Sequence, residues 1–202
     1  MQKGIYFDAM DLLLKGKHWQ VFLLLFGLPI LGIIFFLIFM VVFAETQTHT
    51  AATLVVAAVL FSFIIASAGF LIWLYYLTSK LYARLMNKAN VNFGLFKVCI
   101  VMLGIFLLCL TSVLYNIADK FTGLGARTIA EGTLATVMPP LFLLATLSLF
   151  YCLYFTARAL KTVELRRVIT VQEYAAEFVQ LWYFPLGVWI LQPRINKIFS
   201  GK

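Results

Sequence analysis

Four long runs of apolar residues dominate the chain, and short polar stretches separate them. The runs cover residues 19–44, 51–78, 95–117 and 133–157, and Lys97 is the only charged residue inside any of them. A helix of about 20 apolar residues crosses the roughly 30 Å of hydrocarbon in a bilayer. A single helix satisfies its own backbone in lipid, whereas barrel strands would alternate polar with apolar residues. The pattern therefore predicts four transmembrane helices in one membrane domain, residues 1–202.

Two shorter segments with helical periodicity flank these runs. Residues 5–15 repeat apolar side chains at helical spacing, which predicts a helix lying on the membrane surface. Near the other end, Thr170 and Glu173 have the spacing of a capping box that opens a helix, and Pro185 should bend or end it. Residues 178–191 are apolar but too few to span, so the segment 171–191 is either interfacial or re-entrant.

The helix that Thr170 opens should have two contrasting faces. One face is expected to carry Tyr174, Phe178, Leu181 and Trp182, and the other Glu173, Glu177 and Gln180. The predicted fold class is thus all-α. It is a polytopic membrane protein with four transmembrane helices and interfacial amphipathic helices at both ends.

Composition agrees with a membrane protein, and the distribution of charge predicts its orientation across the membrane. Hydrophobic residues make up 63% of the chain and charged residues 12%, half the charge of a typical soluble domain. Near the predicted spans, eleven basic residues lie on the side of the two termini, against Lys120 and Arg127 on the other. The positive-inside rule therefore predicts that both termini are cytoplasmic. The formal charge of +8 reflects this orientation rather than nucleic-acid binding.

Tryptophan and arginine side chains gather at the same predicted interface, where amphipathic rings and cations meet lipid headgroups. Each near-surface Lys or Arg contributes about 1 kcal/mol of attraction to anionic lipid. We therefore expect the bilayer itself, with anionic headgroups on the cytoplasmic face, to be a partner. The predicted membrane-interface residues are Trp19, Trp73, Arg166, Arg167, Trp182, Trp189, Arg194 and Lys197.

The spans contain little that could do chemistry. No ionisable residue lies at mid-depth, which argues against a proton-coupled pump. Cys99, Cys109 and Cys152 all fall inside spans and form no C-x-x-C pair. The two histidines lie on opposite sides of the predicted membrane. We therefore assign no catalytic, cofactor-binding or metal-binding residue, and we expect a protein that is not an enzyme.

Small residues and prolines suggest how the helices pack. Ala58, Ser62 and Ala66 repeat every four residues, with Gly69 close to the same face, which favours close packing inside one bundle over a dimer interface. Pro29, between Gly27 and Gly32, should kink the first span. The pair Pro139–Pro140 either kinks the fourth span or forms its first turn.

The C-terminal part carries a resemblance. The ending WYFPLGVWILQPRINK, preceded by VELRR and YAAEF, resembles the C-terminus of an uncharacterised family of small bacterial four-helix membrane proteins. The stretch GKHWQVFLLLFGLP is compatible with the same family. The resemblance covers about a quarter of the chain. It implies a bacterial inner-membrane location, and it brings no activity, substrate or site residue.

These features favour a non-catalytic accessory, scaffold or regulatory membrane subunit that acts through a membrane-protein partner or a homo-oligomer. The alternative is a small transporter or lipid-handling protein, with the kinked first and fourth spans around a cavity. An enzyme would need carboxylates outside the spans, either Asp119 and Glu131 or the cytoplasmic Glu164, Glu173 and Glu177. No nucleic-acid partner is expected.

Overall fold

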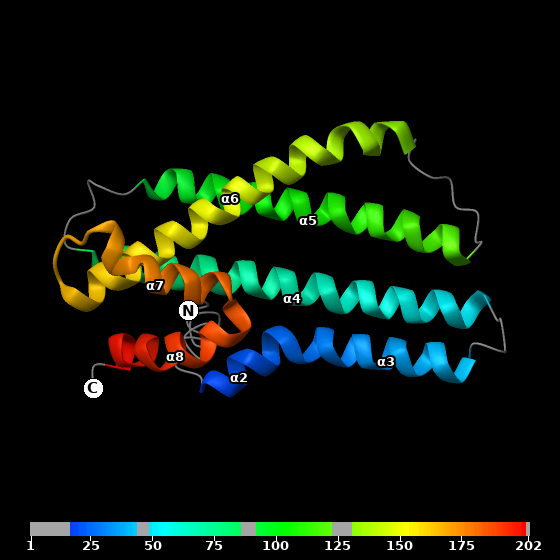
Figure 1. Ribbon diagram of the computed structural model, residues 1–202, viewed down its shortest axis with the longest axis horizontal. Coiled ribbons are helices and arrows are strands. Elements are labelled where there is room, and N and C mark those ends of the chain that lie inside the picture. Colours follow the sequence, from blue (N-terminus) through cyan, green and yellow to red (C-terminus); the bar gives the residue numbers. More distant parts are fainter. Residues whose placement is uncertain (1–16, 44–48, 86–91, 123–130, 201–202) are drawn as a thin grey trace, which may run out of the picture.

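The computed structural model describes residues 17–43, 49–85, 92–122 and 131–200, and all regular structure in these residues is helical (Figure 1). The expected all-α class is thus confirmed for them, while the segment 5–15 lies outside the described residues. The elements are α2 (His18–Phe22), the π-helical turn η1 (Leu23–Gly27), α3 (Leu28–Phe43), α4 (His49–Arg84), α5 (Phe93–Thr122), α6 (Glu131–Leu165), α7 (Val171–Trp182) and α8 (Phe184–Ser200).

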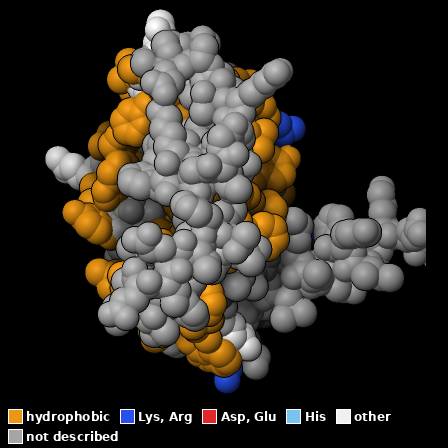
Figure 2. Space-filling view, turned by 90° about the vertical axis from the view of Figure 1, so that its right-hand side faces the viewer, with side chains coloured by type: hydrophobic (Ala, Val, Ile, Leu, Met, Phe, Trp, Pro, Cys, Tyr) orange, Lys and Arg blue, Asp and Glu red, His pale blue; other side chains and the backbone are white. Residues whose placement is uncertain are grey.

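Three helices are long and apolar enough to cross a membrane. They are Ala57–Arg84 in α4, Phe93–Leu114 in α5 and Thr136–Leu165 in α6. The pair Trp19–Gly27 and Pro29–Ile38, bent by 46°, passes the same test when taken together. Hydrophobic side chains cover most of the described surface visible in Figure 2, as expected for helices that face lipid.

Prolines lie in two of these spans, and in the first of them Pro29 lies beside a bend. The backbone bends where η1 meets α3, next to Gly27 and Pro29. Pro29 has no N–H to donate, and its ring conflicts with the carbonyl four residues earlier, so an α-helix cannot pass through it undisturbed. Pro139 and Pro140 lie inside α6, which begins at Glu131, so neither forms its first turn.

The long helices run side by side along the bundle (Figure 1). α3 packs on α4, α4 packs on both α5 and α6, and α5 packs on α6. We call the end where α4 stops and α5 starts the basic end, because Lys80, Arg84 and Lys97 lie there. Much of the buried core also lies toward this end, with Trp73, Leu77, Leu81, Phe96, Phe155 and Leu160 almost fully enclosed.

Small side chains bring α4 close to its neighbours. A Cβ added to Gly32 would lie 2.6 Å from Ser62 Oγ, and one added to Gly69 would lie 3.0 Å from a Leu25 methyl group. Of the predicted small-residue seam, Ser62 and Gly69 therefore pack against α3 and η1 inside the bundle, whereas Ala58 is exposed and Ala66 borders a cavity. Near the basic end, Thr78 and Thr156 hydroxyls lie 2.7 Å apart and join α4 to α6.

α7 and α8 form a helical hairpin beside α2 and the basic end of α6 (Figure 1). The capping box is present, because the Thr170 backbone N–H donates to Glu173 Oε2 at 2.7 Å. α7 ends at Trp182, and after the single residue Tyr183 α8 starts at Phe184, with Pro185 in its first turn. The two helices touch closely at Gly187, where an added Cβ would lie 1.7 Å from the Gln180 carbonyl oxygen.

Replacing Gly187 should therefore open the hairpin. In Gly187→Ala, the methyl group has no space against the Gln180 backbone, so we expect a loss of about 1–3 kcal/mol. Thermal unfolding in detergent measures the loss. Gly104→Ala is the matched control, because nothing lies within 4 Å of a Cβ there and alanine favours a helix. Equal melting temperatures for the two variants would contradict the close contact.

Candidate functional site

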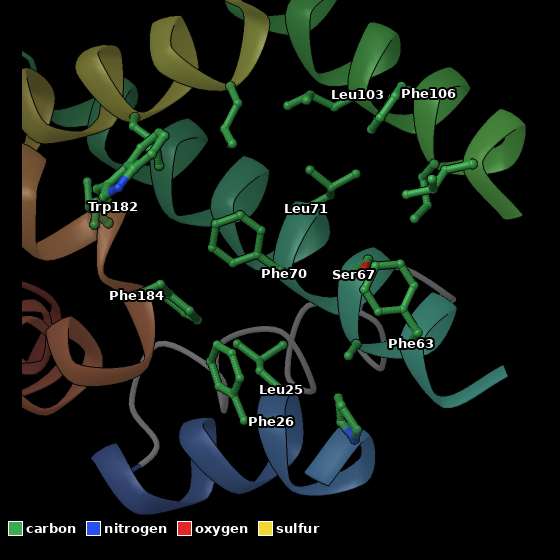
Figure 3. Close-up of a pocket in the computed structure, with 17 residues that line it drawn as sticks. Leu25, Phe26, Phe63, Ser67, Phe70, Leu71, Leu103, Phe106, Trp182 and Phe184 are labelled. Atoms are coloured by element: carbon green, nitrogen blue, oxygen red, sulfur yellow. The ribbon is translucent and has the colours of Figure 1, made fainter. Parts of the chain in front are cut away.

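An apolar cavity of about 490 Å³ lies between the helices (Figure 3). This volume is within the usual range of small-molecule sites, about 300–1,000 Å³. Five parts of the chain supply its walls: η1 and α3, α4, α5, α6, and the α7–α8 hairpin. The lining residues are Leu25, Phe26, Pro29, Phe63, Ala66, Ser67, Phe70, Leu71, Leu103, Phe106, Leu107, Leu110, Leu149, Leu153, Leu181, Trp182 and Phe184.

One face of α4 forms the back wall of the cavity. Phe63, Ala66, Ser67, Phe70 and Leu71 are spaced as neighbours on a single helical face. Figure 3 shows the Phe63 and Phe70 rings beside the hollow, with the short Ser67 side chain between them. Because Ala66 and Ser67 are small, the space between the larger rings stays open.

The cavity persists because α3 does not close onto α6. In the described part of the chain, α3 packs against α4 and η1 and has no extensive contact with α6. The bend at Gly27 and Pro29 sets the direction in which α3 leaves η1. Among the described helices, only the hairpin therefore covers the side of the bundle between α3 and α6.

The α7–α8 hairpin forms the floor of the cavity toward the basic end. The Phe184 ring lies against Phe70, Trp73 and Phe26, with ring centres 4.7, 4.8 and 5.6 Å away. The Trp182 ring stacks on Phe150 of α6 at 4.5 Å. These aromatic contacts fix the tip of the hairpin to α4, η1 and α6, and they separate the cavity from the basic end.

A cluster of charged side chains holds the base of this hairpin. Glu177 of α7 is only 2% exposed at its side chain, and it accepts hydrogen bonds from Lys161 Nζ at 3.0 Å and Arg194 Nη2 at 2.7 Å. Arg194 also donates to Glu164 through Nε at 3.1 Å and through Nη2. We call Lys161, Glu164, Glu177 and Arg194 the ionic cluster. It joins α6, α7 and α8 in one place.

The ionic cluster favours the charged forms of Glu177 and Arg194. Burial alone would raise the pKa of Glu177, but the hydrogen bonds from Arg194 and Lys161 outweigh burial and hold this pKa below its ordinary value. The hydrogen bonds that Arg194 donates to Glu164 and Glu177 raise the pKa of the guanidinium further. The pairing at Oε1 therefore offsets part of the cost of placing a carboxylate inside the protein, while the buried Oε2 has no hydrogen-bond partner among the described residues.

The cavity can bind apolar groups, and its lining carries no group suited to acid–base catalysis. Ser67 and the indole of Trp182 supply the only polar side-chain atoms among its lining residues. Among the described residues, no three metal-ligating side chains lie together. Apolar cavities of this kind exclude water and take up hydrocarbon.

The four tryptophans predicted for the membrane interface fall into three settings. Trp73 is 1% exposed and packs inside the protein, whereas Trp182 lines the cavity and is 43% exposed. Trp189 of α8 lies 6.0 Å from the Phe22 ring of α2, the short helix that also holds the exposed Trp19.

The four basic residues of that set are also separated. Arg194 belongs to the ionic cluster, and Arg167 pairs with Glu173. Arg166 has φ 52° in the turn after α6, and Lys197 is exposed in the last part of α8. The structure thus places Arg194 in the ionic cluster at the hairpin base, whereas Arg166, Arg167 and Lys197 lie outside that cluster. Their level in a membrane stays a prediction.

The sequence reasoning missed the role of Glu177. It placed Glu177 opposite Tyr174 and Leu181, but all three are buried on the same face of α7. The spacing carried the signal, because positions 174, 177 and 181 are three and four apart and lie on one helical stripe. Lys161 and Arg194 make this position tolerable for a carboxylate.

Comparisons with known proteins place the chain in no group. No protein-family model, no curated protein and no solved structure matches it. The resemblance to a bacterial four-helix family stays a prediction. The class that the observations define is an all-helical chain with membrane-spanning candidates around an apolar cavity.

Removing the charge of Glu177 should loosen the hairpin. We expect Glu177→Gln to lose about 1–3 kcal/mol, because two charge-assisted hydrogen bonds in a buried place become weaker. Thermal unfolding in detergent at pH 7 measures this loss. Glu173→Gln is the control: glutamine still fits the capping box, and its pair with Arg167 is more exposed, so the loss should be smaller. An equal loss in both variants would contradict this role of Glu177.

Acid should remove the stabilisation that the Glu177 carboxylate gives to the folded protein. Because the pKa of Glu177 is lowered in the folded protein, its contribution is complete above about pH 4.3, the ordinary value, and disappears as the pH falls through the lowered pKa. The difference in melting temperature between the parent chain and Glu177→Gln should therefore be constant from pH 5 to 8 and shrink below about pH 4. A difference that changes between pH 6 and 8 would refute this assignment.

Proposed function

We propose that this protein is a non-catalytic integral membrane protein that binds an acyl chain of a membrane lipid in its cavity. The cavity between η1, α3, α4, α5, α6 and the hairpin tip is the observation that carries the proposal. Within the described part of the chain, no extensive contact closes the side between α3 and α6, and the outer faces of these helices are apolar. An acyl chain is the hydrocarbon that a bilayer offers at that place.

The proposal includes four crossings of the membrane. α4, α5 and α6 supply three, and the bent pair Trp19–Gly27 and Pro29–Ile38 supplies the fourth. Lys80, Arg84 and Lys97 lie at one end of these helices. We assign that basic end to the cytoplasmic side of a bacterial inner membrane, with both termini there and anionic headgroups around it.

The energetics favour reversible occupation. An empty apolar cavity forfeits dispersion contacts, and water finds too few hydrogen-bonding partners there to replace them. A chain that enters from the bilayer gains those contacts but no hydrophobic driving force, because it leaves surroundings that are equally apolar. The bound chain therefore exchanges with the bilayer.

Lipid binding also supports an accessory role for this protein. A protein whose cavity lacks catalytic groups acts through what it binds and touches. We propose a lipid-dependent accessory or lipid-handling subunit, acting with a membrane-protein partner or with a second copy of itself. No nucleic acid, metal or cofactor enters this proposal.

Filling the cavity should expel the lipid. In Ala66→Phe, the ring occupies the space between Phe63 and Phe70 that the small side chain leaves open. We expect retained lipid per protein to fall about tenfold, which corresponds to 1.4 kcal/mol. Native mass spectrometry after gentle extraction counts the lipid, and lipids with brominated chains identify it by mass.

The control for this experiment is Ala57→Phe, the same substitution at an exposed position of α4 outside the cavity. It should retain as much lipid as the parent chain. Equal retention by Ala66→Phe and Ala57→Phe would disprove occupation of the cavity.

A further inference from the structure

The outer face of the α7–α8 hairpin is apolar, and its side chains are exposed among the residues that the structure describes. The most exposed side chains around the tip are Leu186 at 73%, Tyr183 at 61%, and Val179 and Ile190 at 52% each. These residues share one region, since α7 ends and α8 begins between them. Such a face against water would be costly, and large apolar patches mark contact with membrane or partner.

Charge is confined to the base of the hairpin. Residues 178–191 contain no charged side chain. Arg166, Arg167 and Glu173 precede this stretch, and Arg194 and Lys197 follow it. The charged residues on both sides of the apolar stretch therefore lie at the same end of the hairpin.

The tip lies well inside the bundle. Trp182 stacks on Phe150, which comes eight residues before Arg158 in α6, a distance of about 12 Å along the helix. Phe184 contacts Trp73, which comes seven residues before Lys80 in α4, or about 10 Å. Half of the hydrocarbon thickness is about 15 Å. The tip therefore reaches most of the way from the level of these cations toward the middle of the spans.

Three backbone N–H groups at the turn find partners within the turn, which lowers the cost of placing it in hydrocarbon. The Tyr183 N–H donates to the Val179 carbonyl at 2.9 Å, and the Leu186 and Gly187 N–H groups donate to the Tyr183 carbonyl at 3.0 and 2.9 Å. Backbone groups that find partners within their own segment can enter lipid. The carboxylate of Glu177 faces Lys161 and Arg194 rather than the outside.

We infer that α7 and α8 form a re-entrant hairpin, whose outer face is embedded in the lipid chains of the leaflet at the basic end. A helix lying flat on the surface would not bring Phe184 to Phe26 and Phe70 while keeping its charged base at the level of Lys80 and Arg158. The inference concerns the surroundings of the hairpin and is independent of what occupies the cavity. It also makes the hairpin a barrier between the cavity and the water at the basic end.

Cysteine labelling in nanodiscs tests this placement, because water reaches both faces of the membrane there. Leu186→Cys places a thiol at the tip, and Val171→Cys places one at the base, where the parent side chain is 69% exposed. A charged maleimide should label Val171→Cys about ten times faster or more, and both equally after denaturation. The parent chain, with cysteines at 99, 109 and 152, gives the background. Equal rates in the folded protein would overturn the inference.

Fluorescence quenching supplies a second measurement without a change at Leu186. Lipids brominated in the middle of their chains should quench the emission that Tyr183→Trp adds, since Tyr183 lies at the tip, is 61% exposed and does not line the cavity. Headgroup-level quenchers should act on it weakly. Protection from both quencher and maleimide would show that protein covers the hairpin, and this result would also refute the inference.

Discussion

The buried carboxylate of Glu177 determines where the C-terminal hairpin lies. It forms ion pairs with Lys161 of α6 and Arg194 of α8, and Arg194 also pairs with Glu164. Without these cations, a carboxylate that is 2% exposed would be strongly unfavourable, so α7 can dock only where both are present. The docking brings Phe184 and Trp182 to the end of the cavity. An electrostatic requirement at the base thus determines the shape of an apolar site beyond the tip.

The cavity itself follows from a helix bundle that is only partly closed. α4 and α5 pack closely on α6, whereas the bend before α3 directs that helix along α4 and away from α6. In water, a gap of this kind would expose apolar surface and collapse. In a membrane, lipid chains solvate the gap, so the same arrangement is stable and accessible from the side. This is why we connect the cavity to lipid rather than to a water-soluble ligand.

Much of the fold was predictable from hydropathy and local motifs. The long runs at 51–78, 95–117 and 133–157 correspond to α4, α5 and α6, and the Thr170 capping box begins α7. Local rules were sufficient there, because length, apolarity and capping belong to a single segment. The expected first span matches a bent pair that includes a π-helical turn, which the proline and glycines only partly indicated.

The site was not predictable in the same way. In a membrane helix, residues that face lipid and residues that face other helices are equally apolar, so hydropathy gives depth without facing direction. Trp73 was placed by depth alone, and the structure shows its ring enclosed by Phe70 and Phe184. The cavity depends on how α3, α6 and the hairpin are arranged together. No single segment carries that information.

Nuclear Overhauser contacts between lipid chains and protein methyl groups in nanodiscs test the central claim most directly. Leu103 and Leu153 line the cavity and are 8% and 2% exposed, whereas Leu108 and Leu147 face outward at 69% and 58%. Our account predicts contacts from acyl-chain protons to all four. Contacts to Leu108 and Leu147 alone, with none to the cavity pair, would show that no lipid chain enters and would contradict the account.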